Sequence, residues 1–310
     1  MKTTIFPLIL LSVLLFSCTS NDEEPNKELD CQPDNNKVNM TRFVKSESKS
    51  NNVNIGYTYN ELNLLSHRTR SSAPNVFESE YVYNCSNNII EIITDETANP
   101  QRDGSTKYYE YDAENRLTAY RISLQGEFDY QLTYTDNFIN AEGTIWNDPN
   151  ASLNLALNED GLVERLIRTS AVTFYDDIMY THFEYDAKGN IIKIQDYDQN
   201  GSLVNSFSIT YDNNINPYNE QFKSIYIQKF IDLFFHSGHW ASDLIGSEGF
   251  IFPYSKNNII QVTDHTCTAC YEEVTKRTIS YDDEGYPEKI IHSNWGAPAT
   301  ENVIEYYSGQ

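Results

Sequence analysis

The chain has 310 residues, with 45 Asp and Glu against 22 Lys and Arg and a formal net charge of −23 at pH 7. This acidic excess argues against a nucleic-acid partner and against adhesion to anionic membrane surfaces, because both require clustered cations. Aromatic residues make up 13% of the chain, with 23 Tyr and only 3 Met, and this bias favours strands over helices.

Residues 1–17 form the first predicted element, a signal peptide. Lys2 supplies a positive charge, and Ile5 to Phe16 form an almost unbroken apolar run. Such a run is too short for a permanent membrane helix. Leu15 to Cys18 resembles a bacterial lipobox. That resemblance implies cleavage before Cys18 and lipid attachment at this cysteine.

Residues 18–38 form the second predicted element, an acidic tether. Thr19 to Glu28 lacks hydrophobic residues and is expected to stay solvated. A short acidic run after a lipidated cysteine resembles the signal that carries Bacteroidetes lipoproteins to the outer face of the outer membrane; the alternative is a plain linker. The resemblance implies a protein anchored to the outer membrane by its lipid alone and facing the cell exterior.

Residues 39–310 repeat one pattern and are predicted to form a single β domain. The clearest copy runs from Phe183 to Ile194, and similar copies surround Tyr111 and Tyr281. The anchors recur about every 23 to 28 residues. Alternating apolar residues on both sides of an Asp-x-x-Gly turn predict a hairpin. In this turn the Asp caps backbone donors, and the Gly or Asn three residues later adopts a positive φ beside a bulge.

The Tyr-Asp-x-x-Gly pattern is similar to the YD (RHS-type) repeat. Together with the lipobox and the interruption at Asn216-Pro217, it resembles an uncharacterised family of Bacteroidetes lipoproteins with a porin-like β fold. The resemblance implies an all-β fold, an antiparallel meander of hairpins rolled into an open or barrel-like sheet. The toxin-enclosing role of large YD-repeat proteins is not implied, since this chain has few repeats and no toxin domain.

An inserted helix is predicted at about residues 219–237. Asn219 is a suitable cap, and Phe222, Ile225 and Phe230 recur at helical spacing. The helix is expected to pack on an open end or face of the sheet rather than to act as a lid. Charges in segments such as 106–111 and 272–277 are too dense for a lipid-facing band, so the sheet itself is not expected to cross a membrane.

The cysteines suggest two disulfides and, as an alternative, a metal site. The five cysteines are Cys18, Cys31, Cys85, Cys267 and Cys270. Outside the cytoplasm, Cys267 and Cys270 favour a loop disulfide over free thiols. A zinc site with His236, His239 and His265 remains the third interpretation. Parity alone suggests a Cys31–Cys85 bridge.

Function is predicted only as a broad class. No motif for a nucleophile, a metalloprotease or a phosphate loop is present, so the chain is not expected to be an enzyme, and it implies no cofactor and no metal. Asp196 begins like a calcium loop, but Asp198 to Gly201 is better explained as a hairpin turn. Trp146, Trp240 and Trp295 lie in loop-like segments and suit glycan binding. The alternative function is a protein-interaction scaffold; the ligand and the oligomeric state stay open.

Overall fold

The computed structural model describes residues 42–96, 104–123, 128–145, 148–168, 179–219, 221–235, 255–266, 273–293 and 298–307. The chain divides into two compact units, Met1–Gln32 and Pro33–Gln310, and all described residues belong to the second. The predicted signal peptide and the whole of the predicted tether therefore lie outside the described residues.

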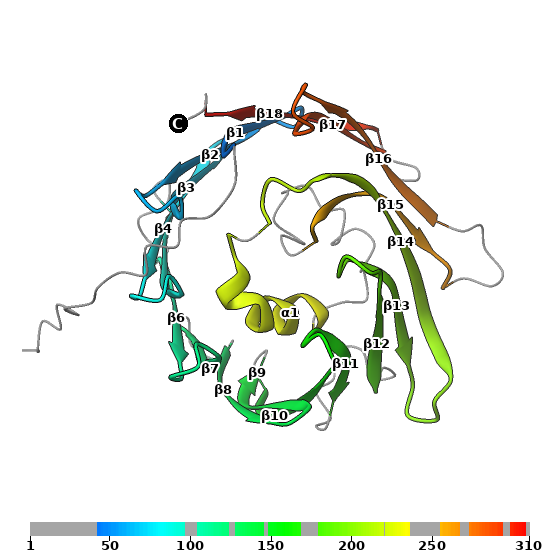
Figure 1. Ribbon diagram of the computed structural model, residues 1–310. Coiled ribbons are helices and arrows are strands. Elements are labelled where there is room, and N and C mark those ends of the chain that lie inside the picture. The colour runs from blue at the N-terminus through cyan, green and yellow to red at the C-terminus, as the bar shows by residue number, and fades with distance from the viewer. Residues whose placement is uncertain are drawn as a thin grey trace, which may run out of the picture. The chain divides into compact units, whose positions relative to one another are not determined.

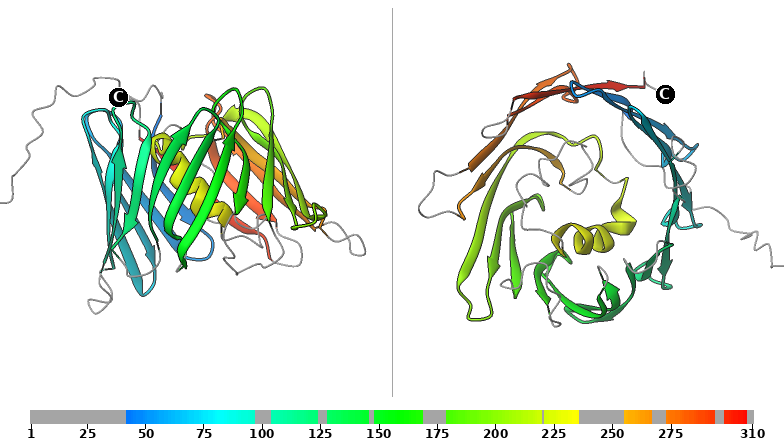
Figure 2. Two further views of the ribbon diagram at one scale, coloured as in Figure 1. Left: turned by 90° about the horizontal axis from the view of Figure 1, so that it is seen from below. Right: turned by 180° about the vertical axis from the view of Figure 1, so that it is seen from behind.

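The described residues form an all-β barrel in which strands follow one another in chain order (Figures 1 and 2). The strands are β1 (Val44–Lys49), β2 (Val53–Tyr59), β3 (Leu65–Ser72), β4 (Asn75–Tyr83), β5 (Ile89–Glu96), β6 (Ser105–Tyr111), β7 (Leu117–Ile122), β8 (Phe128–Thr135), β9 (Phe138–Ile145), β10 (Asp148–Leu157), β11 (Val163–Arg168), β12 (Tyr180–Tyr185), β13 (Ile191–Tyr197), β14 (Leu203–Ile215), β15 (Asn257–Asp264), β16 (Glu273–Tyr281), β17 (Pro287–Ser293) and β18 (Thr300–Tyr306). The helical residues are the 3-10 turn η1 (Lys223–Ile225) and α1 (Tyr226–Phe235).

Each strand pairs antiparallel with its neighbour, and the last strand returns to the first. The closing ladder joins β1 to β18, with Glu47 opposite Ile304, while the other side of β1 pairs with β2. The predicted meander is confirmed, and the sheet is closed rather than open.

Seven hairpin turns share one structure, which explains the repeated sequence pattern. They begin at Asn60, Asn84, Asp112, Asn158, Asp186, Asp198 and Asp282. In each, the first side chain accepts hydrogen bonds from backbone N–H groups two and four residues later, as Asp186 does from Lys188 and Asn190 at 2.8 and 2.9 Å. The fourth residue, Gly or Asn, has a φ between 61° and 87°. A bulge precedes every turn, so the predicted turn chemistry is confirmed.

Tyrosine hydroxyls tie six strands to the strand that precedes each of them in the sheet. Six hydroxyls donate hydrogen bonds of 2.6–2.9 Å to backbone carbonyls: Tyr83 to Leu65, Tyr111 to Ile89, Tyr134 to Leu117, Tyr185 to Val163, Tyr211 to Ile191 and Tyr306 to Pro287. The accepting residue is in every case the first residue of a strand that follows a turn. The tyrosine of the repeat therefore fixes the spacing between successive hairpins.

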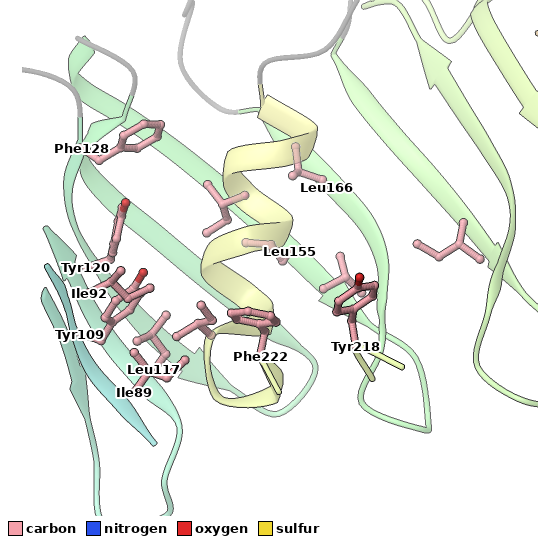
Figure 3. Close-up of a cluster of buried hydrophobic side chains, with 14 of the residues drawn as sticks. Ile89, Ile92, Tyr109, Leu117, Tyr120, Phe128, Leu155, Leu166, Tyr218 and Phe222 are labelled. Carbon is pink, nitrogen blue, oxygen red and sulfur yellow. The ribbon is translucent and has the colours of Figure 1, made fainter. Parts of the chain in front are cut away.

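The core lies inside the barrel, around η1 and α1 (Figure 3). Aromatic side chains from the strands pack against one another there, as Tyr120 does on Tyr109 and Tyr130 with ring centroids 5.2 and 5.4 Å apart. Gln228 of α1 accepts a hydrogen bond from the hydroxyl of Tyr109 at 3.3 Å. Most of the tyrosine excess is thus explained by the interior of the barrel, as the alternation predicts.

The inserted helix begins later than predicted. Asn219 does not cap it; instead, Asn219 closes a turn by donating its N–H to the carbonyl of Asn216 at 3.2 Å. Helical structure starts at Lys223, and the preceding Phe222 makes no side-chain capping bond. The reason is Pro217, since the chain follows the local turn that Asn216 caps by accepting the N–H of Tyr218 at 3.1 Å.

The insertion interrupts a hairpin turn of the common type. Asp212 accepts N–H hydrogen bonds from Asn214 at 3.0 Å and from Asn258 at 3.1 Å. Asn214 is the residue two positions later, as in an uninterrupted turn, and Asn258 takes the place of the residue four positions later. The whole segment from Ile215 to Asn257, helix included, is therefore held between two residues of one capped turn.

Candidate functional site

Most of the residues singled out in the sequence lie outside the described residues. These are Cys18, Cys31, Trp146, Trp240, Trp295, Cys267, Cys270, His236 and His239. Cys85 is described, and it is disulfide-bonded. His265 lies beside the hydroxyl of Ser208 at 2.9 Å. Within the described ranges, no three His, Cys, Asp or Glu residues gather closely enough to hold a metal ion.

The structure shows that Asp198 lies in a hairpin turn, as expected in place of a calcium loop. Asp198 begins one of the capped turns, with its N–H donated to the carbonyl of Ser202 at 3.0 Å. Asp196 instead points into the barrel, where it accepts a hydrogen bond of 2.6 Å from Thr181. The two carboxylates therefore have separate hydrogen-bond partners, those of Asp196 inside the barrel and those of Asp198 within its own turn.

The inner face of β3 to β6 carries a continuous patch of polar and aromatic side chains. Its central row is Arg68, Ser79, Thr94 and Ser105, which pair successively across the four strands. On one side lies the pair Arg70–Phe77, and on the other the pairs Tyr81–Ile92 and Ile92–Lys107. Directly paired residues share a face of a sheet, so all these side chains point into the barrel.

A cavity of about 540 Å³ lies over this patch. The described residues that line it are Arg68, Arg70, Phe77, Ser79, Tyr81, Ile92, Thr94, Ser105, Lys107 and Lys229. Nine come from β3 to β6, and Lys229 comes from α1. This is the site that the barrel builds from its own wall and its internal helix.

The lining combines positive charge with aromatic rings. The Arg70 guanidinium lies 5.9 Å from the centre of the Phe77 ring, a cation–π contact. Tyr81 packs edge-on against Phe222, with ring centroids 6.1 Å apart. Burial raises the pKa of Tyr81, and the charge of Arg68 opposes that shift. Tyr81 is therefore a neutral hydroxyl at the cavity wall.

Hydroxyl groups form the middle of the cavity. The Ser79 and Thr94 oxygens are 3.0 Å apart, so one donates to the other, and each hydroxyl keeps a further acceptor site. The described lining holds no carboxylate and no histidine. The arrangement offers hydrogen bonds, ring faces and positive charge, which suit the binding of a small molecule.

A separate buried network stands where the barrel closes. Glu47 of β1 is fully buried and accepts hydrogen bonds from the hydroxyls of Tyr57, at 2.5 Å, and Tyr218, and from the Asn302 amide at 2.7 Å. Burial lowers the pKa of Arg277 to about 10, while the charge of Glu47 opposes this shift. Strands β1, β2 and β18 all contribute residues to this network. The network, the Glu47 clasp, therefore links the strands at which the barrel closes.

The cationic cavity was not anticipated from the sequence. The signal was present in Arg68-Thr-Arg70, where two cations occupy alternate positions of a strand, and in Lys107 among the tyrosines of β6. Alternation shows that such residues share a face, but it does not show which face of a rolled sheet is the interior.

No protein-family model and no curated protein matches the sequence. Among solved structures, the chain is similar to a porin-like protein from Bacteroides uniformis, with 15% identity, a TM-score of 0.41 and coverage of 86% of this chain and 98% of that one. A porin-like protein from Bacteroides vulgatus gives 9% identity, a TM-score of 0.34 and coverage of 86% and 99%. The Tc holotoxin pore of Photorhabdus luminescens gives 10% identity and a TM-score of 0.36, over 86% of this chain and 13% of that one.

Similarity at this level does not extend to ligands or partners. No helix in the described part of the chain is long and apolar enough to cross a membrane.

Proposed function

We propose that the protein is a non-enzymatic binding protein of the outer membrane, which holds a small ligand inside its barrel. The observation that carries this proposal is the cavity of about 540 Å³ between the inner face of β3 to β6 and Lys229 of α1. Small-molecule sites are typically concave spaces of roughly 300–1,000 Å³ with a few convergent polar groups. The cavity has this size, and hydroxyl and cationic groups converge on it beside the rings of Phe77 and Tyr81.

The scaffold around the cavity is suited to binding because it is rigid. The tyrosine hydroxyls of Tyr83 and Tyr111 fasten β4 to β3 and β6 to β5, and capped turns close the hairpins at Asn60 and Asn84. A preorganised wall lowers the conformational entropy lost when a ligand binds. The lining residues of the cavity therefore come mainly from hydrogen-bonded strands and not from loops.

The predicted location at the outer membrane is consistent with a binding role. The lipobox at Cys18 and the acidic tether indicate attachment through a lipid. The outer wall of β8 shows exposed Asp129, Gln131 and Thr133, whereas a wall facing lipid tails would be apolar at these positions. We infer that the lipid holds the barrel at the membrane and that the wall faces water.

The test compares saccharide binding by two matched variants of the full-length protein in detergent. Thr94→Phe fills the cavity from the inner face, and Thr133→Phe makes the same change on the outer wall. A saccharide array followed by calorimetry is expected to find a ligand of the wild type that Thr133→Phe retains and Thr94→Phe loses.

Two other outcomes would contradict the proposal. If Thr94→Phe binds normally and Trp146→Ala, Trp240→Ala or Trp295→Ala abolishes binding, the loops carry the site. If the folded wild type binds no saccharide, the scaffold function becomes the better explanation, and protein partners should be sought.

A further inference from the structure

The ligand of this cavity can be narrowed by the charge of its lining. Resting on the binding function proposed above, we propose that the cavity takes an acidic saccharide, a small sugar carrying carboxylate or sulfate groups. The cations Arg68, Arg70, Lys107 and Lys229 converge on it from β3, β6 and α1.

The first step is the contrast with the rest of the chain. Acidic residues outnumber Lys and Arg by 45 to 22, yet the described lining contains four cations and no carboxylate. A random sample of this composition would be acidic. Positive charge concentrated in one cavity of an acidic protein attracts anions into that cavity, and it gives no such attraction to neutral molecules.

The second step is the placement of the cations around the cavity. Arg68 ends the hydroxyl row, Arg70 lies two residues further along β3, and Lys107 lies in the adjacent row on β6. Lys229 faces this wall from α1. An anion inside the cavity is therefore reached from more than one side. The two guanidinium groups suit planar, bidentate contacts to carboxylate or sulfate oxygens.

The third step is the part of the lining that is not charged. Ser79, Thr94 and Ser105 offer hydroxyls in one row across three strands, and Phe77 and Tyr81 supply aromatic rings. Hydroxyl rows match the alternating hydroxyls of a sugar, and aromatic faces pack against its C–H groups. A simple inorganic anion would use the cations but leave these groups without a role.

One carboxylate of the same inner face needs separate consideration. Glu96 pairs with Phe77 and so points inward, although it is not among the lining residues. It lies in the same row as Arg70 and Phe77. Lys107 stands on the other side of the hydroxyl row and Lys229 belongs to α1, so these two cations are the better targets for a test.

The test uses matched pairs of sugars that differ in charge: glucuronic acid against glucose, and galactose 6-sulfate against galactose. Inorganic sulfate alone serves as a further probe. Calorimetry is done on the full-length wild type and on Lys107→Gln and Lys229→Gln. Lys276→Gln, which removes an exposed cation from β16, is the control. Circular dichroism and the melting temperature establish that each variant is folded.

The expected result is at least tenfold tighter binding of one acidic sugar than of its neutral partner. That preference should shrink in Lys107→Gln or Lys229→Gln and persist in Lys276→Gln. It should also weaken as salt is raised, and the carboxylate and sulfate pairs show which group is preferred. Binding of inorganic sulfate as tight as that of the sugars would overturn the saccharide assignment.

Different results would overturn the acidic ligand and the binding function on which it rests. Equal affinity for the neutral and acidic members, with binding still lost in Thr94→Phe, overturns the acidic ligand and leaves the binding function standing. Binding of none of the probes, together with an unshifted melting temperature in their presence, overturns the acidic ligand. Absence of binding across the wider saccharide array overturns the binding function as well.

Discussion

Tyrosine has two separate tasks in this protein, and the residues that perform them can be told apart. Some rings fill the interior, as Tyr120 and Tyr130 do with about 1% of their surface exposed. Others stand near strand ends, where the hydroxyl bonds a carbonyl of the preceding hairpin. Burial raises the pKa of Tyr83 and Tyr134, the latter to about 12, so these hydroxyls stay protonated and keep donating.

Replacing Tyr83 with Phe removes one of these hydroxyl bonds and keeps the ring. The Leu65 carbonyl, which accepts this bond at 2.8 Å, then loses its side-chain partner. We expect a loss of about 1 kcal/mol in the free energy of unfolding, measured by urea denaturation. Tyr197→Phe is the control, because the Tyr197 ring stacks on Tyr180 at the outer wall. Equal effects of the two substitutions would contradict the proposed tie between hairpins.

Cys18 carries the prediction that concerns attachment. If the lipobox is used, Cys18→Ser abolishes incorporation of labelled palmitate and releases the protein from the membrane fraction. Cys85→Ser should retain the label, because Cys85 is disulfide-bonded. Label that persists in Cys18→Ser would show that the leader is processed in another way.

At the scale of the element, the hairpin turn explains why Gly and Asn alternate at one position of the repeat. Gly189 has a φ of 87°, and Asn115 has a φ of 62° at the equivalent position. Both residues adopt left-handed backbone conformations at little cost, whereas side chains with an ordinary Cβ do so only with strain. The turn therefore selects a backbone conformation rather than a contact.

Two substitutions at Gly189 separate this explanation from simple lack of space. A Cβ added there would meet only Leu162, at an ordinary 3.6 Å. We expect Gly189→Ala to lower the free energy of unfolding by about 1 kcal/mol, because of the positive φ. Gly189→Asn should cost clearly less. Thermal and urea denaturation of both variants provide the measurement. Equal losses in the free energy of unfolding would show that the positive φ is not the cause of the destabilisation.

At the scale of the whole molecule, closure of the barrel depends on the pairing of β1 with β18, which no local sequence pattern predicts. The clasp around Glu47 joins β1 to β18 and to Tyr218, next to the inserted segment. Nearby, burial and the charges of Arg277 and Lys49 lower the pKa of His292 to about 3 from its usual 6.5. The imidazole is thus kept neutral inside the closed ring.

This neutral histidine makes the stability of the protein sensitive to acid. Unfolding exposes His292, which takes up a proton below pH 6.5, while the folded state does so only near pH 3. Stability should therefore fall as the pH is lowered through this window, by up to about 1.4 kcal/mol per pH unit. Urea denaturation from pH 7 to 4 should show a shallower loss in His292→Gln than in the wild type. The exposed-site change His67→Gln should leave the loss unchanged.

The hairpins could be predicted from the sequence because their signals are local. Asp186 and Gly189 stand three residues apart, and together they determine a turn. Closure of the sheet and the place of the helix depend on contacts such as Glu47 with Asn302, 255 residues apart, which leave no mark on neighbouring residues. The cavity stayed hidden for the same reason, since Arg68 and Lys107 become neighbours of Lys229 only once the ring is closed.

A closed ring has no edge strands, and this affects how the chain reaches its native state. Until β1 meets β18, the growing sheet exposes two edges whose N–H and C=O groups can pair with those of another copy. The hairpins themselves form between near neighbours in the chain, so joining these distant edges is expected to be the late, slow step. Dilution during refolding should accordingly favour the closed barrel over intermolecular sheets, with protein concentration deciding between monomer and aggregate.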